Sequence, residues 1–180
     1  MTKTVLVTPR LSLRHLTSGD SAFVLELMNE PPYIDNIGDR GVRSQADAVR
    51  YIEEKYLASY ARHGFGLYLV ELTETAAPIG ICGLVRRDAL DHPDLGFAYL
   101  QRFWSRGFAM EAASAMLGHS RESLGLTYVY GLVSPRNVRS IRLLGHLGFG
   151  FVRSSQFPGQ PESHLYGAEL RGSDQASNLP

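Results

Sequence analysis

The chain has 180 residues, of which 44% are hydrophobic and 20% are charged, and these values fit one globular domain with a sizeable core. Its 18 Lys and Arg residues balance its 18 Asp and Glu residues, so no overall field favours nucleic acid or an anionic membrane as a partner. The single cysteine, Cys82, excludes an internal disulfide.

The start of the chain carries no apolar core of a signal peptide, and no apolar run approaches the ~20 residues of a membrane span. We therefore expect a cytoplasmic protein.

The N-terminal half is expected to combine one strand, two helices and a hairpin. Alternating Leu11 and Leu13 indicate the strand, and Pro31-Pro32 is expected to stop the first helix. Ser44 can cap the second helix. The expected elements are a strand at 9–16, a helix from 17–20 to 29, a loop at 31–43, a helix at 44–62, and paired strands at 65–72 and 79–85.

The C-terminal half alternates strands and helices. Ser134-Pro135 resembles a helix start, and Gly148 a helix stop. The expected elements are a loop at 86–93, strands at 94–100 and 127–133, helices at 106–121 and 134–147, closing strands at 149–154 and 164–170, and a disordered tail at 171–180. Short turns together with helical crossovers imply one domain, residues 1–170, built on a mixed sheet flanked by helices.

The segment Trp104-Ser105-Arg106-Gly107-Phe108-Ala109-Met110-Glu111-Ala112 joins the strand at 94–100 to the helix that follows. A short strand-to-helix loop aims free backbone N–H groups and the positive end of the helix dipole at one place. Such a place favours an anion, and phosphate in particular.

Five segments occur together in this order: residues 9–16, Pro78-Ile79-Gly80 with Gly83-Leu84, Leu95-Gly96-Phe97, residues 104–112, and Asn137-x-x-Ser140 with Leu147-Gly148-Phe149. Their order and spacing resemble the GNAT acyltransferase superfamily, in particular its ribosomal-protein N-terminal acetyltransferase branch (the RimJ/RimL type). The resemblance covers about residues 8–170. It implies an α/β (α+β) domain whose mixed sheet of about seven strands is splayed in the middle and flanked by about four helices.

The resemblance also implies acetyl-CoA as the donor and a primary amine, on a protein N-terminus or a small molecule, as the acceptor. It places the pyrophosphate on the 104–112 segment, the pantetheine arm on the strand at 94–100, and a further contact on the helix after 134. The implied cofactor-binding residues are Ala98, Tyr99, Leu100, Ser105, Arg106, Gly107, Phe108, Ala109, Met110 and Asn137. Ser105 departs from the pattern, since many relatives carry glycine there.

Two residues are candidates for catalysis. Ser140 is implied to lie near the cofactor sulfur, where a hydroxyl can supply a proton or a hydrogen bond to the departing thiolate. Many relatives use a tyrosine one turn later, where this chain has Leu144. Asp94 starts the cofactor strand, where some relatives place an acidic residue, and is the candidate base. A solvated helix serine and a loop aspartate are the structural alternatives.

Acceptor specificity is expected from the loop at 31–43, the corner at Arg62–Gly66, the loop at 86–93 and the C-terminal hairpin. In the first of these, Tyr33, Asp35 and Asp39 could receive a cationic amine or could be ordinary loop residues. Scattered histidines and one cysteine give no metal-ligand spacing, so we expect no metal. The resemblance allows a homodimer.

We expect an N-acetyltransferase in which the amine attacks acetyl-CoA directly, since Cys82 lies in an apolar strand unsuited to a reactive thiolate. The alternative is a non-catalytic CoA-binding sensor. A dinucleotide-binding oxidoreductase is disfavoured, because no Gly-x-Gly-x-x-Gly follows the first strand.

Overall fold

The computed structural model describes residues 3–156 and 162–170, and its framework is one sheet in the order β1-β2-β3-β4-β5-β6-β8-β7. All neighbouring pairs are antiparallel except β5 and β6, which are parallel. The strands are β1 Thr4–Val7, β2 Leu11–Arg14, β3 Leu67–Leu72, β4 Pro78–Val85, β5 Asp94–Tyr99, β6 Tyr128–Val133, β7 Gly150–Ser155 and β8 Ser163–Glu169. The expected mixed sheet is confirmed, with eight strands in the described residues rather than about seven.

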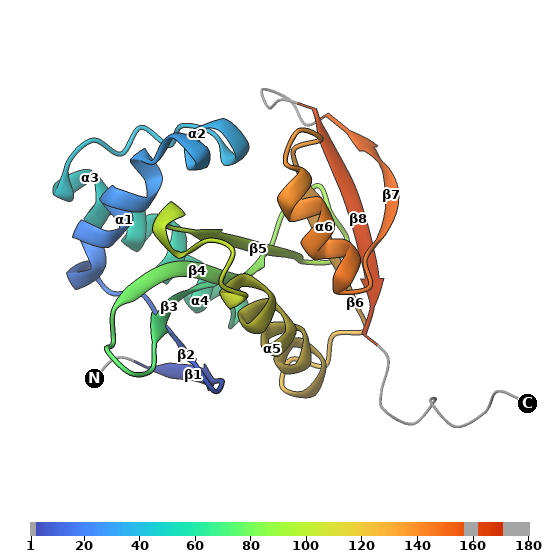
Figure 1. Ribbon diagram of the computed structural model, residues 1–180, viewed down its shortest axis with the longest axis horizontal. Helices are drawn as coiled ribbons and strands as arrows, with labels where there is room; N and C mark the ends of the chain where they lie inside the picture. The colour runs from blue at the N-terminus through green and yellow to red at the C-terminus, as the bar shows by residue number, and fades with distance from the viewer. Residues whose placement is uncertain (1–2, 157–161, 171–180) are drawn as a thin grey trace, which may run out of the picture.

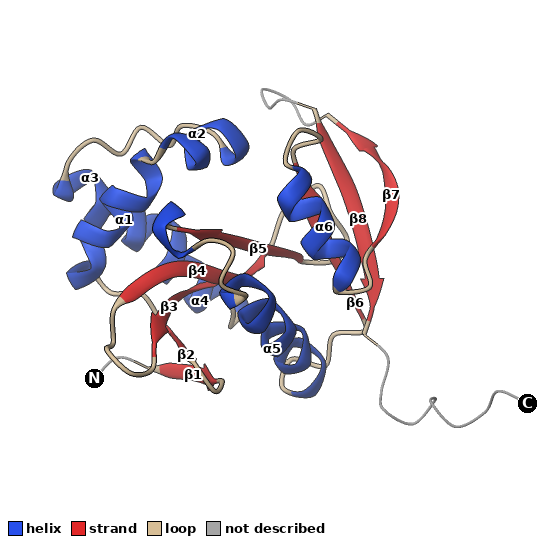
Figure 2. Ribbon diagram, viewed as in Figure 1, coloured by secondary structure: helices blue, strands red, loops and turns tan. Residues whose placement is uncertain are grey.

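The helices lie on both faces of the sheet (Figures 1 and 2). They are α1 Ser21–Asn29, α2 Pro31–Ile37, α3 Gln45–Tyr51, α4 Ala58–His63, α5 Phe108–Glu122 and α6 Val138–His146. A π-helical stretch, Ile52–Leu57, joins α3 to α4, so the described residues contain five separate helices, against about four expected. Short 3₁₀ turns occur at Ser18–Asp20 and Gln101–Phe103. None of the helices in the described ranges combines the length and hydropathy that a bilayer crossing demands.

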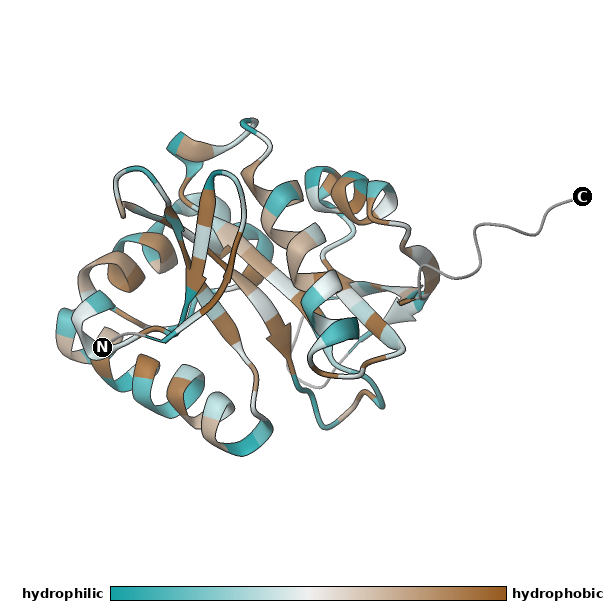
Figure 3. Cartoon of the chain, turned by 90° about the horizontal axis from the view of Figure 1, so that it is seen from below, coloured by the Kyte–Doolittle hydropathy of each residue, from teal (hydrophilic) through white to brown (hydrophobic). Residues whose placement is uncertain are grey.

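The core has two parts because the inner strands are covered on both faces. On β3, Tyr68 and Val70 belong to the cluster that includes α5, whereas Leu69 belongs to the cluster formed with α1, α3 and the π-helical stretch. Side chains alternate between the faces of a strand, so consecutive residues enter different clusters. Figure 3 shows hydrophobic residues gathered along these central strands.

The sheet is splayed between β5 and β6. These strands share one register pair, Asp94 with Tyr130, whereas β4 and β5 pair along six positions from Gly80–Tyr99 to Val85–Asp94. Beyond Asp94, the edge of β5 that faces β6 therefore has no partner strand. The expected opening in the middle of the sheet is confirmed.

The expected strand at 9–16 is corrected to β2 alone, and β1 was not anticipated. The two strands form a hairpin whose turn is closed by Thr8 and Leu11, with the Thr8 N–H donating to the Leu11 carbonyl at 2.8 Å and the Leu11 N–H donating to the Thr8 hydroxyl at 3.0 Å. The four apolar or β-branched residues of β1 are too few for alternation to stand out, and pairing with β2 decides their conformation.

The expected loop at 31–43 is wrong for its first half. Pro31 and Pro32 occupy the first positions of α2 rather than simply ending α1. Proline is well tolerated there because the first-turn N–H groups of a helix have no internal acceptor. The consequence is that Tyr33 and Asp35 lie on a helix.

The predicted start of α6 is also corrected. The helix begins at Val138 rather than at Ser134-Pro135, and the Asn137 side chain caps it by accepting from the Ser140 N–H at 3.1 Å. The cap by Ser44 is confirmed, since its side chain accepts from the Asp47 N–H. The expected tail at 171–180 lies outside the described residues.

Candidate active site

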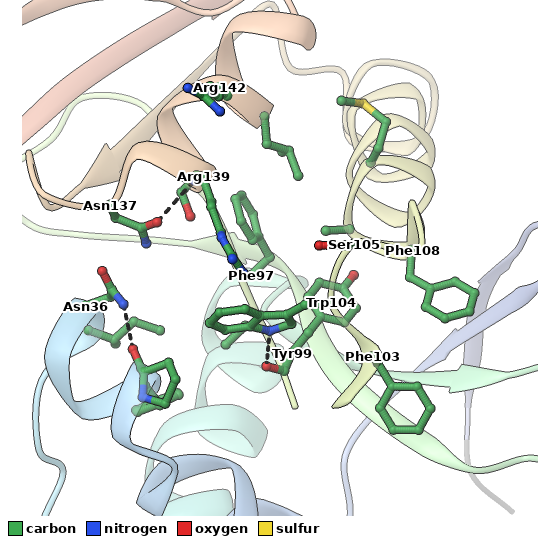
Figure 4. Close-up of a pocket in the computed structure, with 18 of the residues that line it drawn as sticks. Asn36, Phe97, Tyr99, Phe103, Trp104, Ser105, Phe108, Asn137, Arg139 and Arg142 are labelled. Carbon is green, nitrogen blue, oxygen red and sulfur yellow. Dashed lines mark hydrogen bonds between the residues drawn. The ribbon is translucent and has the colours of Figure 1, made fainter. Parts of the chain in front are cut away.

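Two adjoining cavities open at the splay. The first, of about 460 Å³, lies between β5, the start of α5 and α6, and the second, of about 580 Å³, extends from the same place under α2, α4 and the loop between β4 and β5. Figure 4 shows the first cavity. The residues that line both cavities are Tyr33, Asn36, Ile37, Phe97, Ala98, Asn137 and Ser140. These seven residues mark the junction where two substrates could meet.

The first cavity is closed at one end by the start of α5. Gly107 precedes the helix with φ of +80°, and no side chain caps the helix. The N–H groups of Phe108, Ala109 and Met110 precede the first intrahelical bond, which the Glu111 N–H donates to the Gly107 carbonyl at 3.0 Å. Because all three residues line the cavity, uncapped amides and the positive end of the helix dipole lie at its wall. This arrangement suits an anion.

A polar brace holds the turn before α5. Glu111 accepts from the Thr8 hydroxyl at 2.6 Å, from the Arg10 N–H at 3.0 Å and from Arg10 Nε at 2.6 Å. Arg10 also donates to the Arg106 carbonyl at 3.0 Å, and its guanidinium lies 4.7 Å from the centre of the Phe108 ring. The β1–β2 turn is thus tied to the loop through Glu111 and Arg10.

Ser105 adopts φ of +60°, one of two non-glycine residues with positive φ among the described residues. This left-handed region favours glycine, because a side chain there meets the backbone. The departure from glycine at this position therefore carries conformational strain at the rim of the first cavity.

The free edge of β5 supplies backbone groups to the junction. The Leu100 N–H donates to the Ile79 carbonyl of the β4 side at 3.0 Å, and the Pro93 carbonyl accepts from the Tyr130 N–H of β6 at 2.9 Å. Since backbone groups alternate along a strand, the N–H groups of Phe97 and Tyr99 point toward the splay. Phe97 was not among the predicted site residues, because strand orientation cannot be read without knowing which neighbour each edge has.

Trp104, which follows the 3₁₀ turn Gln101–Phe103, and Arg139 of α6 meet at the wall of the first cavity. Trp104 Nε1 donates to the Tyr99 carbonyl at 2.8 Å, and the Arg139 guanidinium lies 5.0 Å from the centre of the Trp104 ring (Figure 4). Arg142 lines the same wall one turn further along α6. These two arginines were not among the predicted site residues, although their spacing of three on a helix places them on one side.

Asn137 and Ser140 lie at the junction of the two cavities. The side-chain oxygen of Asn137, Oδ1, caps α6 by accepting from the Ser140 N–H. The side-chain nitrogen, Nδ2, therefore remains to contact a ligand. The Ser140 hydroxyl has no hydrogen-bond partner within the described ranges.

Asp94 lines the second cavity and is only 2% exposed. Arg87 Nε donates to its Oδ1 at 2.7 Å and Arg87 Nη2 to its Oδ2 at 3.3 Å. Burial raises the pKa of Asp94, and the Arg87 charge opposes that rise. The site therefore contains a shielded carboxyl whose proton affinity is higher than that of a surface aspartate.

Some predicted residues lie outside the cavities. Leu100 is fully buried, with its N–H engaged by Ile79, and the Arg106 side chain lies 5.6 Å from the centre of the Phe103 ring. Asp35 is exposed and lines neither cavity, and Asp39 pairs with Arg43. Tyr33, in contrast, lies at the junction, where burial raises its pKa to about 12.

Cys82 lines neither cavity and is fully buried, and burial raises the pKa of its thiol to about 12. A thiol in that environment stays protonated near neutral pH and is a poor nucleophile.

A splayed mixed sheet with an uncapped helix N-terminus at the splay defines a class of acyl-transfer domain. The chain belongs to the GNAT acetyltransferase family, whose domain model, described as "Acetyltransferase (GNAT) domain", matches residues 10–150. It is an N-acetyltransferase.

Relatives and solved structures agree with this membership. The chain is 27% identical over 158 residues to YkkB of Bacillus subtilis (strain 168), covering 84% of this chain and 88% of that protein. It is similar to the acetyltransferase of Agrobacterium tumefaciens str. C58, with a TM-score of 0.77, 26% identity, and coverage of 92% of this chain and 93% of that one.

The fold also matches RimL, a ribosomal L7/L12 alpha-N-protein acetyltransferase solved in complex with coenzyme A. The TM-score is 0.78 at 14% identity, covering 93% of this chain and 98% of that one. At this identity the likeness shows the shared fold.

Proposed function

We propose that this chain transfers the acetyl group of acetyl-CoA to a primary amine, on a protein N-terminus or a small molecule, by direct attack with both substrates bound. The observation that carries the proposal is the meeting of two cavities at Ser140 and the free edge of β5. One cavity ends in an anion-binding helix terminus, and the other opens beside a buried carboxyl.

The first cavity suits the donor. The N–H groups at the start of α5 would bind the pyrophosphate, the closely approaching backbone at Gly107 leaves room for it, and Arg139 and Arg142 add positive charge on the opposite wall. The backbone of Phe97 and Tyr99 would pair with the amides of the pantetheine arm. The solved complex of RimL with coenzyme A supports this choice of donor.

Acetyl-CoA supplies an activated acetyl group on a thioester, and its transfer needs hydrogen bonds to the carbonyl oxygen and a proton or hydrogen bond for the departing thiolate. The N–H groups of the free β5 edge are the candidates for the first task, because backbone donors held in place stabilise developing negative charge. The Ser140 hydroxyl is the candidate for the second, since it lines both cavities and is not otherwise bonded in the described residues.

The amine must lose a proton before it attacks. A terminal α-amine, with a pKa near 7.7–8.0, is about one tenth neutral at pH 7, whereas a lysine amine with a pKa near 10.4 is neutral to only a few parts in ten thousand. Asp94 is the proposed proton acceptor, acting through water from the second cavity. Burial raises the affinity of the Asp94 carboxyl for the incoming proton, and the Arg87 charge favours its ionised form. The buried, protonated Cys82 argues against a covalent acetyl-enzyme.

A screen of amines with acetyl-CoA, followed by thiol release and by mass spectrometry of the products, tests the function. The panel contains peptides with varied N-termini and small primary amines. We expect an acetylated product with at least one acceptor. Tight binding of acetyl-CoA without turnover against any amine would instead identify a CoA sensor.

Asp94→Asn tests the base. We expect kcat to fall about tenfold or more and the dependence of the rate on a deprotonated carboxyl to disappear from the pH profile, because general base catalysis is commonly worth that much. Arg87→Gln is the matched control for loss of the ion pair. If both variants lose activity equally with an unchanged pH profile, Asp94 has a structural role.

A further inference from the structure

The second cavity carries an excess of positive charge. Arg87 and Asp94 cancel each other as an ion pair. Of the remaining charged side chains that line it, none forms an ion pair within residues 3–156 and 162–170. The cationic ones are Arg40, Lys55, Arg62 and Arg86, and the anionic ones are Glu54 and Asp88. His63 also lines the cavity and adds positive charge when protonated.

One part of this lining is suited to an oxyanion. Arg40, Tyr33 and Tyr51 all line this cavity, where the Arg40 guanidinium donates to the Ile37 carbonyl at 3.3 Å. Burial raises the pKa of both tyrosines, and the positive charge of Arg40 opposes that rise. Buried tyrosines stay neutral at physiological pH and keep a proton to donate. A guanidinium with two phenolic donors offers charge-assisted hydrogen bonds to a carboxylate or a phosphate.

The charge balance also disfavours a polycationic acceptor. A polyamine would place several ammonium groups against Arg40, Lys55 and Arg62, whose charges no neighbouring carboxylate cancels by ion pairing. Like charges brought together in a partly enclosed space cost free energy, and that cost selects against such substrates.

We propose that the acceptor is a primary amine that also carries a carboxylate or a phosphate. The anion binds on the Arg40 side of the second cavity and the amine lies at the junction beside Ser140. This inference rests on the proposed amine acetylation and narrows its substrate class. The same chemistry can come from the acidic N-terminal segment of a peptide or from a small acidic amine, and the test separates the two.

The test measures kcat/KM for matched acceptors with acetyl-CoA saturating. The peptide pair is Ser-Glu-Asp-Ala-amide against Ser-Gln-Asn-Ala-amide, which differ in charge but hardly in shape. The small-molecule pair is β-alanine against β-alaninamide, compared per neutral amine, and spermidine is the polycation. We expect kcat/KM for the acidic member of at least one pair to exceed that for its neutral partner about tenfold or more, because hydrogen bonds to charged groups contribute enough free energy for such a ratio. We expect spermidine to be the poorest acceptor. A preference within the peptide pair identifies the acceptor as a peptide, and a preference within the small-molecule pair identifies it as a small molecule.

Substitutions in the second cavity test which residues cause the preference for an acidic acceptor. Arg40→Gln should lower kcat/KM for the acidic acceptor about tenfold and leave that for its neutral partner within about twofold. Lys55→Gln should lower, and Glu54→Gln should raise, the rate with the acidic acceptor by about two- to threefold. Rate changes of opposite sign at two adjacent positions of one helical turn cannot come from a general loss of stability. Arg50→Gln, on α3 and outside both cavities, is the control and should change neither rate.

Equal rates within both pairs, or a preference for spermidine, would overturn the inference while leaving acetyl transfer intact. If no acceptor in the panel is acetylated, titration calorimetry of both matched pairs into the acetyl-CoA-loaded protein still decides the question. Tighter binding of the acidic member of either pair, lost in Arg40→Gln, supports the inference, and equal or no binding of both members in both pairs contradicts it.

Discussion

The two cavities that meet at the splay are built in different ways. The first is lined mainly by one stretch of chain, residues 97–110, with α2 and α6 supplying its other walls. The second is lined largely by side chains from α2, the π-helical stretch, α4, the β4–β5 loop and β6, which are far apart in the sequence. In the proposed assignment the first cavity takes the donor and the second the acceptor, so substitutions in the separate segments of the second can change the acceptor without disturbing the donor.

The largest expected effect comes from placing a charge in the first cavity. Gly107→Asp should weaken acetyl-CoA binding at least about a hundredfold, because a negative charge at the start of α5 repels the pyrophosphate and the backbone has φ of +80°. The new side chain would also meet Arg10, whose Nη2 lies 3.3 Å from the added Cβ. Titration calorimetry measures this loss. Gly125→Asp, at φ of +66° with open space around it, is the matched control for backbone strain and should bind normally. Unchanged affinity in Gly107→Asp would refute the pyrophosphate assignment.

Ser140→Ala acts at the junction rather than in either cavity alone. We expect kcat to fall about tenfold while the affinity for acetyl-CoA stays within about twofold, because the lost hydroxyl serves the departing thiolate rather than the bound donor. Steady-state kinetics and calorimetry separate the two quantities. Ser114→Ala, an exposed serine on α5, is the control. A wild-type turnover number in Ser140→Ala would remove the serine from the mechanism.

Glu111→Gln should weaken acetyl-CoA binding several-fold by loosening the brace between Arg10 and the turn before α5. Burial pushes the pKa of Glu111 up, but hydrogen bonds from Thr8 and Arg10 outweigh it and hold the pKa below its ordinary value. The brace therefore contributes stability above the unfolded-state pKa of Glu, and that contribution is lost as pH falls through the folded-state pKa.

Urea unfolding at several pH values measures this contribution. Wild type should exceed Glu111→Gln in stability by about 1 kcal/mol at pH 7, and the difference should shrink below about pH 4.3. A difference that is the same at every pH would show that the Glu111 charge has no part in the brace.

The smallest effect is expected from Ser105→Gly, which changes strain but not charge. Replacing a residue at φ of +60° by glycine should stabilise the fold by up to about 1 kcal/mol, and acetyl-CoA affinity should stay within about twofold. Thermal unfolding gives the stability and calorimetry the affinity. Destabilisation by this substitution would mean that the Ser105 side chain makes a contribution larger than its strain.

Local patterns were enough to predict most of the framework. The hairpin of β3 and β4, the strand β5, the start of α5 and the cap at Ser44 each follow from a few neighbouring residues, so no distant contact is needed to recognise them. One error fell where a distant contact decides the structure, because β1 forms by pairing with β2. The other was a local pattern that can be interpreted in two ways, because two prolines can end one helix and also open the next, as Pro31 and Pro32 do in α2.

For the site, the sequence was enough to predict the proposed acetyl-CoA side, because a glycine before a helix and the Asn137–Ser140 spacing are local features that a short segment carries. The tertiary structure alone decided which backbone edge of β5 is free, that Glu111 and Arg10 hold the turn, and that Asp35 lies outside the cavities. It also decided the charge of the second cavity, whose lining carries an excess of positive charge although the net charge of the whole chain is zero. Which charges face one another depends on how helices and loops distant in the chain pack around the splay, and no local pattern encodes that packing.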